Sequence, residues 1–359
     1  MIPFLQLTPG EDAQVVREAI DRVVQRGWFV LGPELDAFEA EFAEATRAPR
    51  AVGVGTGTDA IAIALRALGI GPGDDVITSP LSAAYSALAI MMAGARPVFA
   101  DIDADRLTLA PDAVAAAVTP RTAAILPVHI YGQPADMPAI AAVASRHNLA
   151  IVEDCCQAHL ATCGGQPVGS FGAAAAYSFY PTKNLGALGD GGAITVKDPA
   201  VAERARRLRN GGQTSRYQHD EFGLNSRLDE IQAAILRARL RLLPRWTESR
   251  RSIAGAYRAA LVGASGITVP REHDAGHVYH LFPVMSPDRE AVRARLGDAG
   301  IETLVHYPVP IPRQRALTGE APADCPVANR VCEEVFSLPL YPALPPTAVQ
   351  AVAAALRPS

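Results

Sequence analysis

From residue 177 to residue 192 the chain reads YSFYPTKNLGALGDGG. The apolar run 173–180 predicts a short strand, and the four glycines and one aspartate that follow Leu185 argue against a regular element after it. Lys183 therefore stands at the end of a strand, between aromatic and small apolar residues. Burial there disfavours the charged amine and lowers its pKa, so that the amine can form a Schiff base with a carbonyl. We expect a reactive lysine here, although most lysines are solvated surface groups.

The composition indicates a globular protein of about two domains. The chain has 359 residues, of which 49% are hydrophobic and only 6% aromatic, so the core must consist mainly of Ala, Val, Leu and Ile. The formal net charge is −4, and the arginines within 204–209 are typical of a solvated helix face. We therefore expect no nucleic-acid partner.

The cysteines and the first residues bear on the compartment. Five cysteines without a Cys-x-x-Cys pair favour a reducing compartment, and hence the cytoplasm. Residues 1–10 lack the basic start and long apolar run of a signal peptide, and no stretch approaches the ~20 apolar residues of a membrane span. We expect a cytoplasmic protein that does not engage a membrane.

Short apolar strands alternate with helix-length amphipathic segments after a helical N-terminal cover, residues 11–46. This alternation, with both strand faces apolar, predicts an α/β fold whose sheet is mostly parallel and covered on both sides. The expected strands lie near residues 52–54, 76–77, 98–100, 124–126, 151–152, 174–177 and 193–196. Ligand sites in such sheets lie beyond the carboxyl ends of the strands.

The C-terminal part has a different rhythm. A helix is expected over 226–243, ended by Pro244, and another over 247–261. A strand at 278–285 and helices at 288–299 and 346–357 follow. The sequence therefore predicts a large domain, residues 1–245, that includes the N-terminal cover, and a smaller α+β domain, residues 246–359.

The segment Gly57-Thr58-Asp59 follows the first expected strand and opens an Ala-rich helix. Glycine lets backbone amides approach a ligand, Thr58 or Asp59 can cap the helix, and a helix N-terminus favours a phosphate dianion. A tight turn is the simpler explanation. A dinucleotide site is disfavoured, because the spacing is not Gly-x-Gly-x-x-Gly and the acids at 74–75 precede the second strand. No lysine stands in a Gly-Lys-Ser/Thr motif, which excludes a P-loop.

A buried strand near 151–152 ends in Asp154. A carboxylate there is costly unless it faces a cation, although it can also cap the next turn. A Schiff-base lysine, a buried carboxylate and a phosphate cradle at strand ends of one sheet match pyridoxal 5′-phosphate (PLP). Lys183 would hold the aldehyde, and Asp154 would keep the pyridine nitrogen protonated, so that the ring accepts electrons from the substrate carbon. The lysine amine would then move the proton as general acid and base.

Together the motifs resemble the DegT/DnrJ/EryC1/StrS aminotransferases, which act on nucleotide-linked keto-sugars and some cyclitols. The resemblance runs over nearly the whole chain, from 28–34 to 337–342, with signatures at 57–60, 127–133, 153–154, 178–192, 223–227 and 306–308. It implies a fold-type I PLP-dependent transferase, similar to aspartate aminotransferase, that forms a dimer with both active sites at the subunit interface.

The resemblance also implies roles for single residues. Lys183 corresponds to the lysine that holds PLP, Asp154 to the partner of the pyridine nitrogen, and Gln157 to a contact of the ring or its hydroxyl. Asn225 resembles the residue that reaches the phosphate of the neighbouring subunit's cofactor. Phosphate ligands are expected at Gly57, Thr58 and Ser178, a further cofactor contact at Asp59, and substrate contacts at His306, Tyr307 and His159.

Two segments depart from the family pattern. Residues 80–85 read PLSAAY, with alanines near the place of the aromatic that stacks on the pyridine ring. Tyr85 can take over from one turn further on, or the ring packs on small apolar groups. The family loop His-Tyr-Pro-x-Pro-x-His has Pro312 in place of its second histidine, which affects the substrate contacts inferred from that loop.

The leading hypothesis is transfer of an amino group from glutamate to a keto-sugar nucleotide, with a 3-keto-6-deoxyhexose on deoxythymidine diphosphate (dTDP) as the favoured acceptor. A PLP-dependent sugar dehydratase of the same family is an alternative, but such enzymes carry histidine in place of the lysine. The third hypothesis is a regulatory relative that keeps only the fold. The joint presence of Lys183, Asp154 and the phosphate ligands argues against it, because a scaffold does not need a buried unpaired acid.

Metal-like patterns do not predict a metal site. Asp101-Ile102-Asp103-Ala104-Asp105 imitates the start of a calcium loop, but Arg106 stands where glycine is needed. The histidines at 273, 277 and 280 have ligand-like spacing, yet Gly276 and a following strand prevent a shared helix face.

Overall fold

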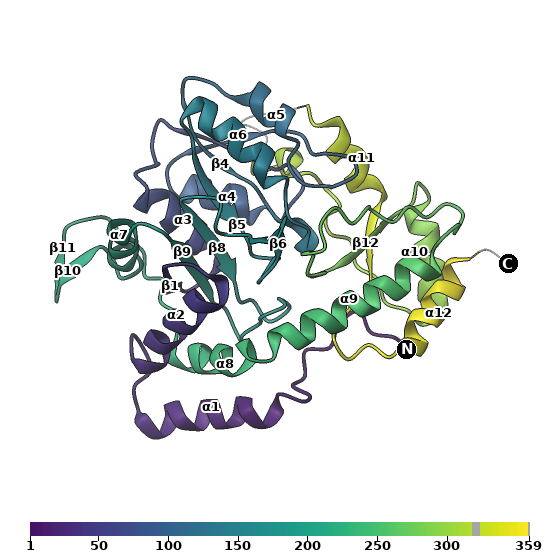
Figure 1. Ribbon diagram of the computed structural model, residues 1–359, viewed down its shortest axis with the longest axis horizontal. Coiled ribbons are helices and arrows are strands. Elements are labelled where there is room, and N and C mark those ends of the chain that lie inside the picture. Colours follow the sequence, from purple (N-terminus) through teal and green to yellow (C-terminus); the bar gives the residue numbers. More distant parts are fainter. Residues whose placement is uncertain (318–323, 358–359) are drawn as a thin grey trace.

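A seven-stranded sheet forms the centre of the computed structural model, which describes residues 1–317 and 324–357. Its strand order is β1-β9-β8-β5-β4-β2-β3 (Figure 1). Only β9 runs antiparallel to its neighbours, so the predicted mostly parallel α/β sheet is confirmed. The strands are β1 Arg50–Val54, β2 Asp75–Thr78, β3 Arg96–Phe99, β4 Thr122–Leu126, β5 Ala150–Asp154, β8 Ala174–Ser178 and β9 Gly192–Val196.

Alternate residues along each strand enter two apolar layers. On β8, Ala174 and Ala176 join one layer, and Ala175 and Tyr177 join the other. The first layer is completed by α3 Gly57–Ala67, α4 Tyr85–Met92 and α7 Pro199–Arg209. The second is completed by α2 Pro33–Thr46, α5 Pro111–Ala117, α6 Met137–His147 and α8 Glu230–Leu240.

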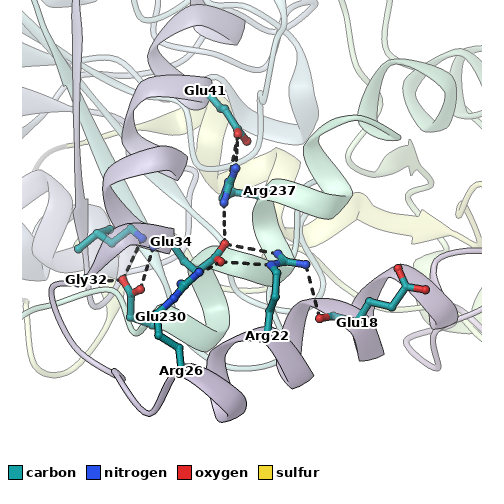
Figure 2. A network of polar contacts seen from close by, with 9 residues as sticks. Glu18, Arg22, Arg26, Gly32, Glu34, Glu41, Glu230 and Arg237 are labelled. Atoms are coloured by element: carbon teal, nitrogen blue, oxygen red, sulfur yellow. Dashed lines mark hydrogen bonds and ion pairs between the residues drawn. The ribbon is translucent and has the colours of Figure 1, made fainter.

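The N-terminal helix α1, Ala13–Arg26, is fastened to α2 and α8 by ion pairs around one carboxylate (Figure 2). Glu34 is almost fully buried and pairs with Arg22 and Arg26 of α1 and with Arg237 of α8. Glu230, also buried, accepts three backbone hydrogen bonds at the start of α2. These contacts fix the N-terminal cover against the sheet.

The C-terminal part packs on the long helix α9, Leu243–Ala260, which runs from α8 towards α10 and α12 in Figure 1. The strands β12 and β13 pair antiparallel, and a separate apolar cluster joins them to α9, α10 and α12. The bounds of these elements are α10 Arg289–Asp298, α12 Pro346–Leu356, β12 Phe282–Met285 and β13 Val335–Leu338, and α11 Pro326–Glu334 packs in another apolar cluster. Four short strands, β6 Thr162–Cys163, β7 Gln166–Pro167, β10 Gln213–Ser215 and β11 Gln218–His219, form two hairpins.

The expected helix over 226–243 was wrong in its bounds. It begins four residues later, at Glu230, ends at Leu240, and is followed at once by α9. Pro244 lies in the first turn of α9, where its missing N–H has no helical partner to lose. A domain boundary between residues 245 and 246 stays a prediction, and that position falls inside α9. Among the described residues, no helix combines the length and the apolar character needed to cross a bilayer.

Candidate active site

Lys183 lies in the irregular connection between β8 and β9. Its backbone N–H donates to Tyr180 O at 2.8 Å, which closes a tight turn after the strand. On one side Asn184 donates to Val278 O at 3.0 Å, and on the other Arg239 from α8 donates to Gly186 O at 2.6 Å. The lysine is therefore held in place by contacts to both parts of the molecule.

The surroundings of Lys183 lower its pKa. Burial disfavours the charged amine, while the nearby Cys156 and Asp154 oppose that shift without cancelling it. Burial and, to a smaller extent, the positive charge of Lys183 lower the pKa of His159 to about 3. The same two causes lower the pKa of His306 to about 4. Neutral histidines and a partly desolvated amine therefore share this region, and Asp154 lies within electrostatic reach of Lys183, as the sequence required.

Asp154 ends β5 and is oriented by two donors. Ser86 Oγ, in the first turn of α4, donates to its Oδ2 at 2.8 Å, and the backbone N–H of Cys156 donates to its Oδ1 at 3.1 Å. Both Ser86 and Asp154 are buried. The sequence does not predict Ser86 as a site residue, because no local pattern connects residue 86 with residue 154.

The start of α3 meets the end of β8. A Cβ on Gly57 would lie 2.6 Å from Ser178 Cβ and 3.0 Å from Cys156 Sγ, so only glycine fits there. The first amides of α3 have no partner within the helix and are available to an anion beside Ser178. This geometry fits the phosphate cradle expected at Gly57 and Thr58, and its binding of a cofactor phosphate stays a prediction.

The cap of α3 differs from the expectation. Thr56, and not Thr58 or Asp59, caps the helix by accepting from the N–H of Asp59 at 3.0 Å. The Asp59 carboxylate instead accepts from Ser226 Oγ at 2.7 Å, and Ser226 Oγ accepts from the N–H of Gly55 at 2.9 Å. Asp59 therefore braces the cradle against the segment before α8. Its direct contact with a cofactor stays a prediction.

Gln157 connects the strand ends with the loop at 306–307. Its Oε1 accepts from Tyr131 N at 2.7 Å, and its Nε2 donates to Tyr307 OH at 3.1 Å. Tyr131 OH in turn donates to His306 O at 2.5 Å. His306 and Tyr307 are thus placed beside Gln157. Tyr131 is a further site residue that sequence analysis quoted only within a motif.

Three predicted residues lie differently from the rest. His159 is fully buried, with its ring 5.9 Å from that of Tyr177 and 5.7 Å from that of Phe179, and its expected contact with substrate stays a prediction. Tyr85 is 64% exposed at the start of α4, and Asn225 is exposed before α8. The ring-stacking role of Tyr85 and the intersubunit role of Asn225 stay predictions.

A buried cluster of His129, Glu153 and Cys155 resembles a metal-ligand set. Hydrogen bonds account for it, because His129 Nδ1 accepts from Ala135 N at 3.0 Å, which leaves Nε2–H to donate to Glu153 at 3.2 Å. The Glu153 carboxylate also accepts three backbone N–H groups of residues 169–172. The cluster therefore braces the turn before β8.

Two cavities open on the segment that carries Lys183. One of about 610 Å³ is lined by Thr182, His280 and His306, and the other of about 420 Å³ by Thr182 and Lys183. The residues present fit PLP: an amine with a lowered pKa, a buried carboxylate held by Ser86, and a helix N-terminus with a glycine that a Cβ would obstruct. Fold and site together define a fold-type I PLP-dependent transferase.

Comparison with known proteins makes the class specific. The model of the DegT/DnrJ/EryC1/StrS aminotransferase family matches residues 11–357, and the chain belongs to this family. It is therefore an aminotransferase, with PLP as its cofactor.

The chain is similar over almost its full length to characterised relatives. It is 47% identical over 348 residues to dTDP-3-amino-3,4,6-trideoxy-alpha-D-glucose transaminase of Streptomyces venezuelae, covering 96% of this chain and 92% of that protein. It is 46% identical over 361 residues to erythromycin biosynthesis sensory transduction protein EryC1 of Saccharopolyspora erythraea, covering 99% of each. The crystal structure of S. venezuelae DesV with a ketimine intermediate has a TM-score of 0.97 and 46% identity, covering 99% of this chain and 97% of that one.

Proposed function

We propose that this sugar aminotransferase takes the amino group from glutamate and delivers it to the keto carbon of a sugar linked to dTDP. The observation that carries the proposal is the 47% identity to a dTDP-3-amino sugar transaminase in a chain that keeps Lys183 and Asp154 within electrostatic reach of each other. The same likeness supports carbon 3 of a deoxyhexose as the position of amination. Five free cysteines support a cytoplasmic location.

Each site residue has a chemical task in this proposal. Lys183 would hold PLP and afterwards move a proton with its Nζ, for which a lowered pKa suits it. Asp154 would contact the pyridine nitrogen, and the start of α3 with Ser178 would hold the phosphate. When bound, PLP supplies an electron sink for the substrate carbon that bears nitrogen.

A homodimer with shared active sites is part of the proposal. Large apolar side chains remain exposed on the single chain, and clusters of such groups are typical of interaction surfaces. They include Trp28, Phe29, Tyr180 and Phe222. Asn225 and Tyr85, exposed beside the site, would be covered by the partner subunit.

The test follows the amino group. Purified holoenzyme is mixed with ¹⁵N-glutamate and a panel of dTDP- and UDP-linked 3-keto and 4-keto sugars, and the nucleotide products are identified by mass spectrometry. We expect ¹⁵N in a dTDP-3-amino sugar, with 2-oxoglutarate as coproduct. Label in a UDP-linked or 4-amino product instead would show that the acceptor is wrong, and label in no sugar would refute the acceptor class.

A regulatory function is the second candidate, because a relative at 46% identity has a sensory transduction name. A control separates the two candidates. Borohydride reduction of holoenzyme should attach the cofactor mass to the peptide that contains Lys183, and glutamate added beforehand should prevent this attachment. Holoenzyme that is labelled equally with and without glutamate would favour the regulatory candidate.

A further inference from the structure

The cavity of about 420 Å³ lies between the N-terminal segment 5–12, the Lys183 turn, the first turns of α9 and residues 341–343. Its charged lining residues are Glu11, Asp12, Lys183, Arg239, Arg245 and Arg250. Four cations against two carboxylates leave an excess of two positive charges. A polar cavity of this sign beside a reactive lysine favours an anion.

The two carboxylates are already engaged. Asp12 accepts from Arg239 Nε at 2.8 Å, in a pair that is buried. Glu11 pairs with Arg245 and also accepts from Trp246 Nε1 at 2.5 Å, in the exposed mouth of the cavity. Neither acid pairs with Arg250, so its positive charge stays unpaired in this cavity even when Lys183 holds PLP.

Arg250 is a buried cation without a carboxylate partner among the described residues. Its side chain is 4% exposed, and Nη1 donates to the carbonyl oxygens of Tyr279, His280 and Leu340, each at 3.2 Å. Its Nε has no hydrogen-bond partner in the described parts of the chain. Burial lowers the pKa of the guanidinium to about 10. A buried guanidinium with a free donor is costly unless an anion meets it.

We propose that this cavity binds an anionic group of a substrate, a carboxylate or a phosphate, between Arg250 and Arg245. The inference rests on the proposed function, which names two substrates that carry such an anion. These anions are the carboxylates of the amino donor and the diphosphate of the acceptor nucleotide. A planar guanidinium can donate two parallel hydrogen bonds to either group. Because Lys183 lines the same cavity, the anion anchors the substrate next to the reacting amine.

Binding of 2-oxoglutarate and of dTDP to the holoenzyme tests the proposal, with each dissociation constant measured by isothermal titration calorimetry. Arg245→Gln and Arg250→Lys should each raise the constant for one of the two probes at least tenfold. The affected probe identifies the source. Glu11→Gln removes the competing carboxylate and should lower the same constant severalfold.

Arg251→Gln is the matched control. Arg251 is on the same helix, is exposed and is absent from the cavity lining, so both constants should stay unchanged. Arg250→Lys also disturbs three carbonyl contacts, and if it does not fold, Arg245→Gln and Glu11→Gln decide. The proposal is overturned if, in both Arg245→Gln and Glu11→Gln, the dissociation constants of 2-oxoglutarate and dTDP stay within twofold of the wild-type values. Wild-type protein that shows this binding but aminates no sugar nucleotide would refute the proposed function and leave the anion site standing.

Discussion

The carboxylate of Asp154 accepts a hydrogen bond from Ser86 Oγ at 2.8 Å, which fixes the position of its Oδ2. A buried carboxylate that loses a hydrogen bond turns or takes up a proton, and it then serves a pyridine nitrogen poorly. Ser86 acts only through Asp154, so it is a positioning residue. Its effect should appear in cofactor binding as well as in rate.

Ser86→Ala should weaken PLP binding about fivefold to tenfold, the equivalent of about 1–1.4 kcal/mol for one lost hydrogen bond. Equilibrium dialysis of the apoenzyme against PLP measures this change. Ser82→Ala is the control, because Ser82 Oγ lies 3.4 Å from Ser86 Oγ and, in the described parts of the chain, does not hydrogen-bond to Asp154. Ser86→Thr keeps the hydroxyl and should restore most of the affinity. Equal affinities for wild type and Ser86→Ala would remove Ser86 from the site.

Helix α3 can present its N-terminus to a ligand only because it begins with glycine. Thr56 satisfies the N–H of Asp59, so the earlier amides of the first turn remain for an anion. Gly57, at the start of α3, packs against Ser178, at the end of β8. The absence of a side chain at residue 57 therefore sets the distance between the helix start and the strand end. The cradle is therefore a property of two elements in contact.

Gly57→Ala should lower PLP affinity by at least tenfold, because the new methyl group would lie 2.6 Å from Ser178 Cβ and push α3 away from β8. The same dialysis assay applies, with far-ultraviolet circular dichroism to verify folding. Gly255→Ala, in α9 with nothing within 4 Å of the added carbon, is the control and should leave affinity unchanged. A folded Gly57→Ala protein with wild-type affinity would contradict the assigned cradle.

Helices α1, α2 and α8 share one titratable group. Burial alone would raise the pKa of Glu34, but hydrogen bonds from Arg22 and Arg237 lower it below its ordinary value of 4.5 (Figure 2). A lowered folded-state pKa means that the carboxylate stabilises the fold above the ordinary value, and this stability is lost as the pH falls through the folded-state pKa. Attachment of α1 should therefore weaken in acid.

Glu34→Gln should reduce the free energy of unfolding by about 1–3 kcal/mol at neutral pH, because the hydrogen bonds from Arg22, Arg26 and Arg237 lose their charged acceptor. The difference from wild type should shrink as the pH falls below about 4.5. Urea unfolding at several pH values measures both effects. Gln14→Ala, in the same helix and bonded only to the exposed Glu18, is the control. A difference that is constant across the acid range would show that Glu34 is not the titrating group.

On the scale of the whole molecule, Asn225 and Tyr85 stay exposed on the single chain. A homodimer would place these residues against the partner subunit. Its assembly would then control cofactor retention, because one wall of each site would come from the second copy.

Asn225→Ala should raise the PLP dissociation constant severalfold and leave the fold and the dimer intact. Sedimentation velocity measures assembly, and dialysis measures the cofactor. Mixed dimers of Asn225→Ala with Lys183→Ala supply the sharper readout, because one composite site then lacks both residues and the other keeps both. Half of the wild-type activity in the mixed dimer, separated from both homodimers, supports sharing, whereas Asn225→Ala with unchanged PLP affinity contradicts it.

Local patterns were sufficient for the sheet and for part of the site. All seven central strands follow from apolar runs and breakers, and Lys183, Asp154 and Gly57 follow from their places at strand ends. Errors arose where local rules have two readings. Proline ends helices and also begins them, so Pro244 was read as the end of a helix although it lies in the first turn of α9.

By itself, the sequence determined how strands and helices follow one another along the chain, the reactive amine of Lys183, the carboxylate of Asp154 and the family. These features depend on neighbours along the chain. Only the tertiary structure decided that Ser86 holds Asp154, that Gln157 joins Tyr131 to Tyr307, and that Arg250 is buried without an acid beside it. The reason is physical: hydrogen bonds and unpaired charges between segments 26 to 150 residues apart are fixed by how strands are ordered and helices packed. No local pattern of residues encodes those distances.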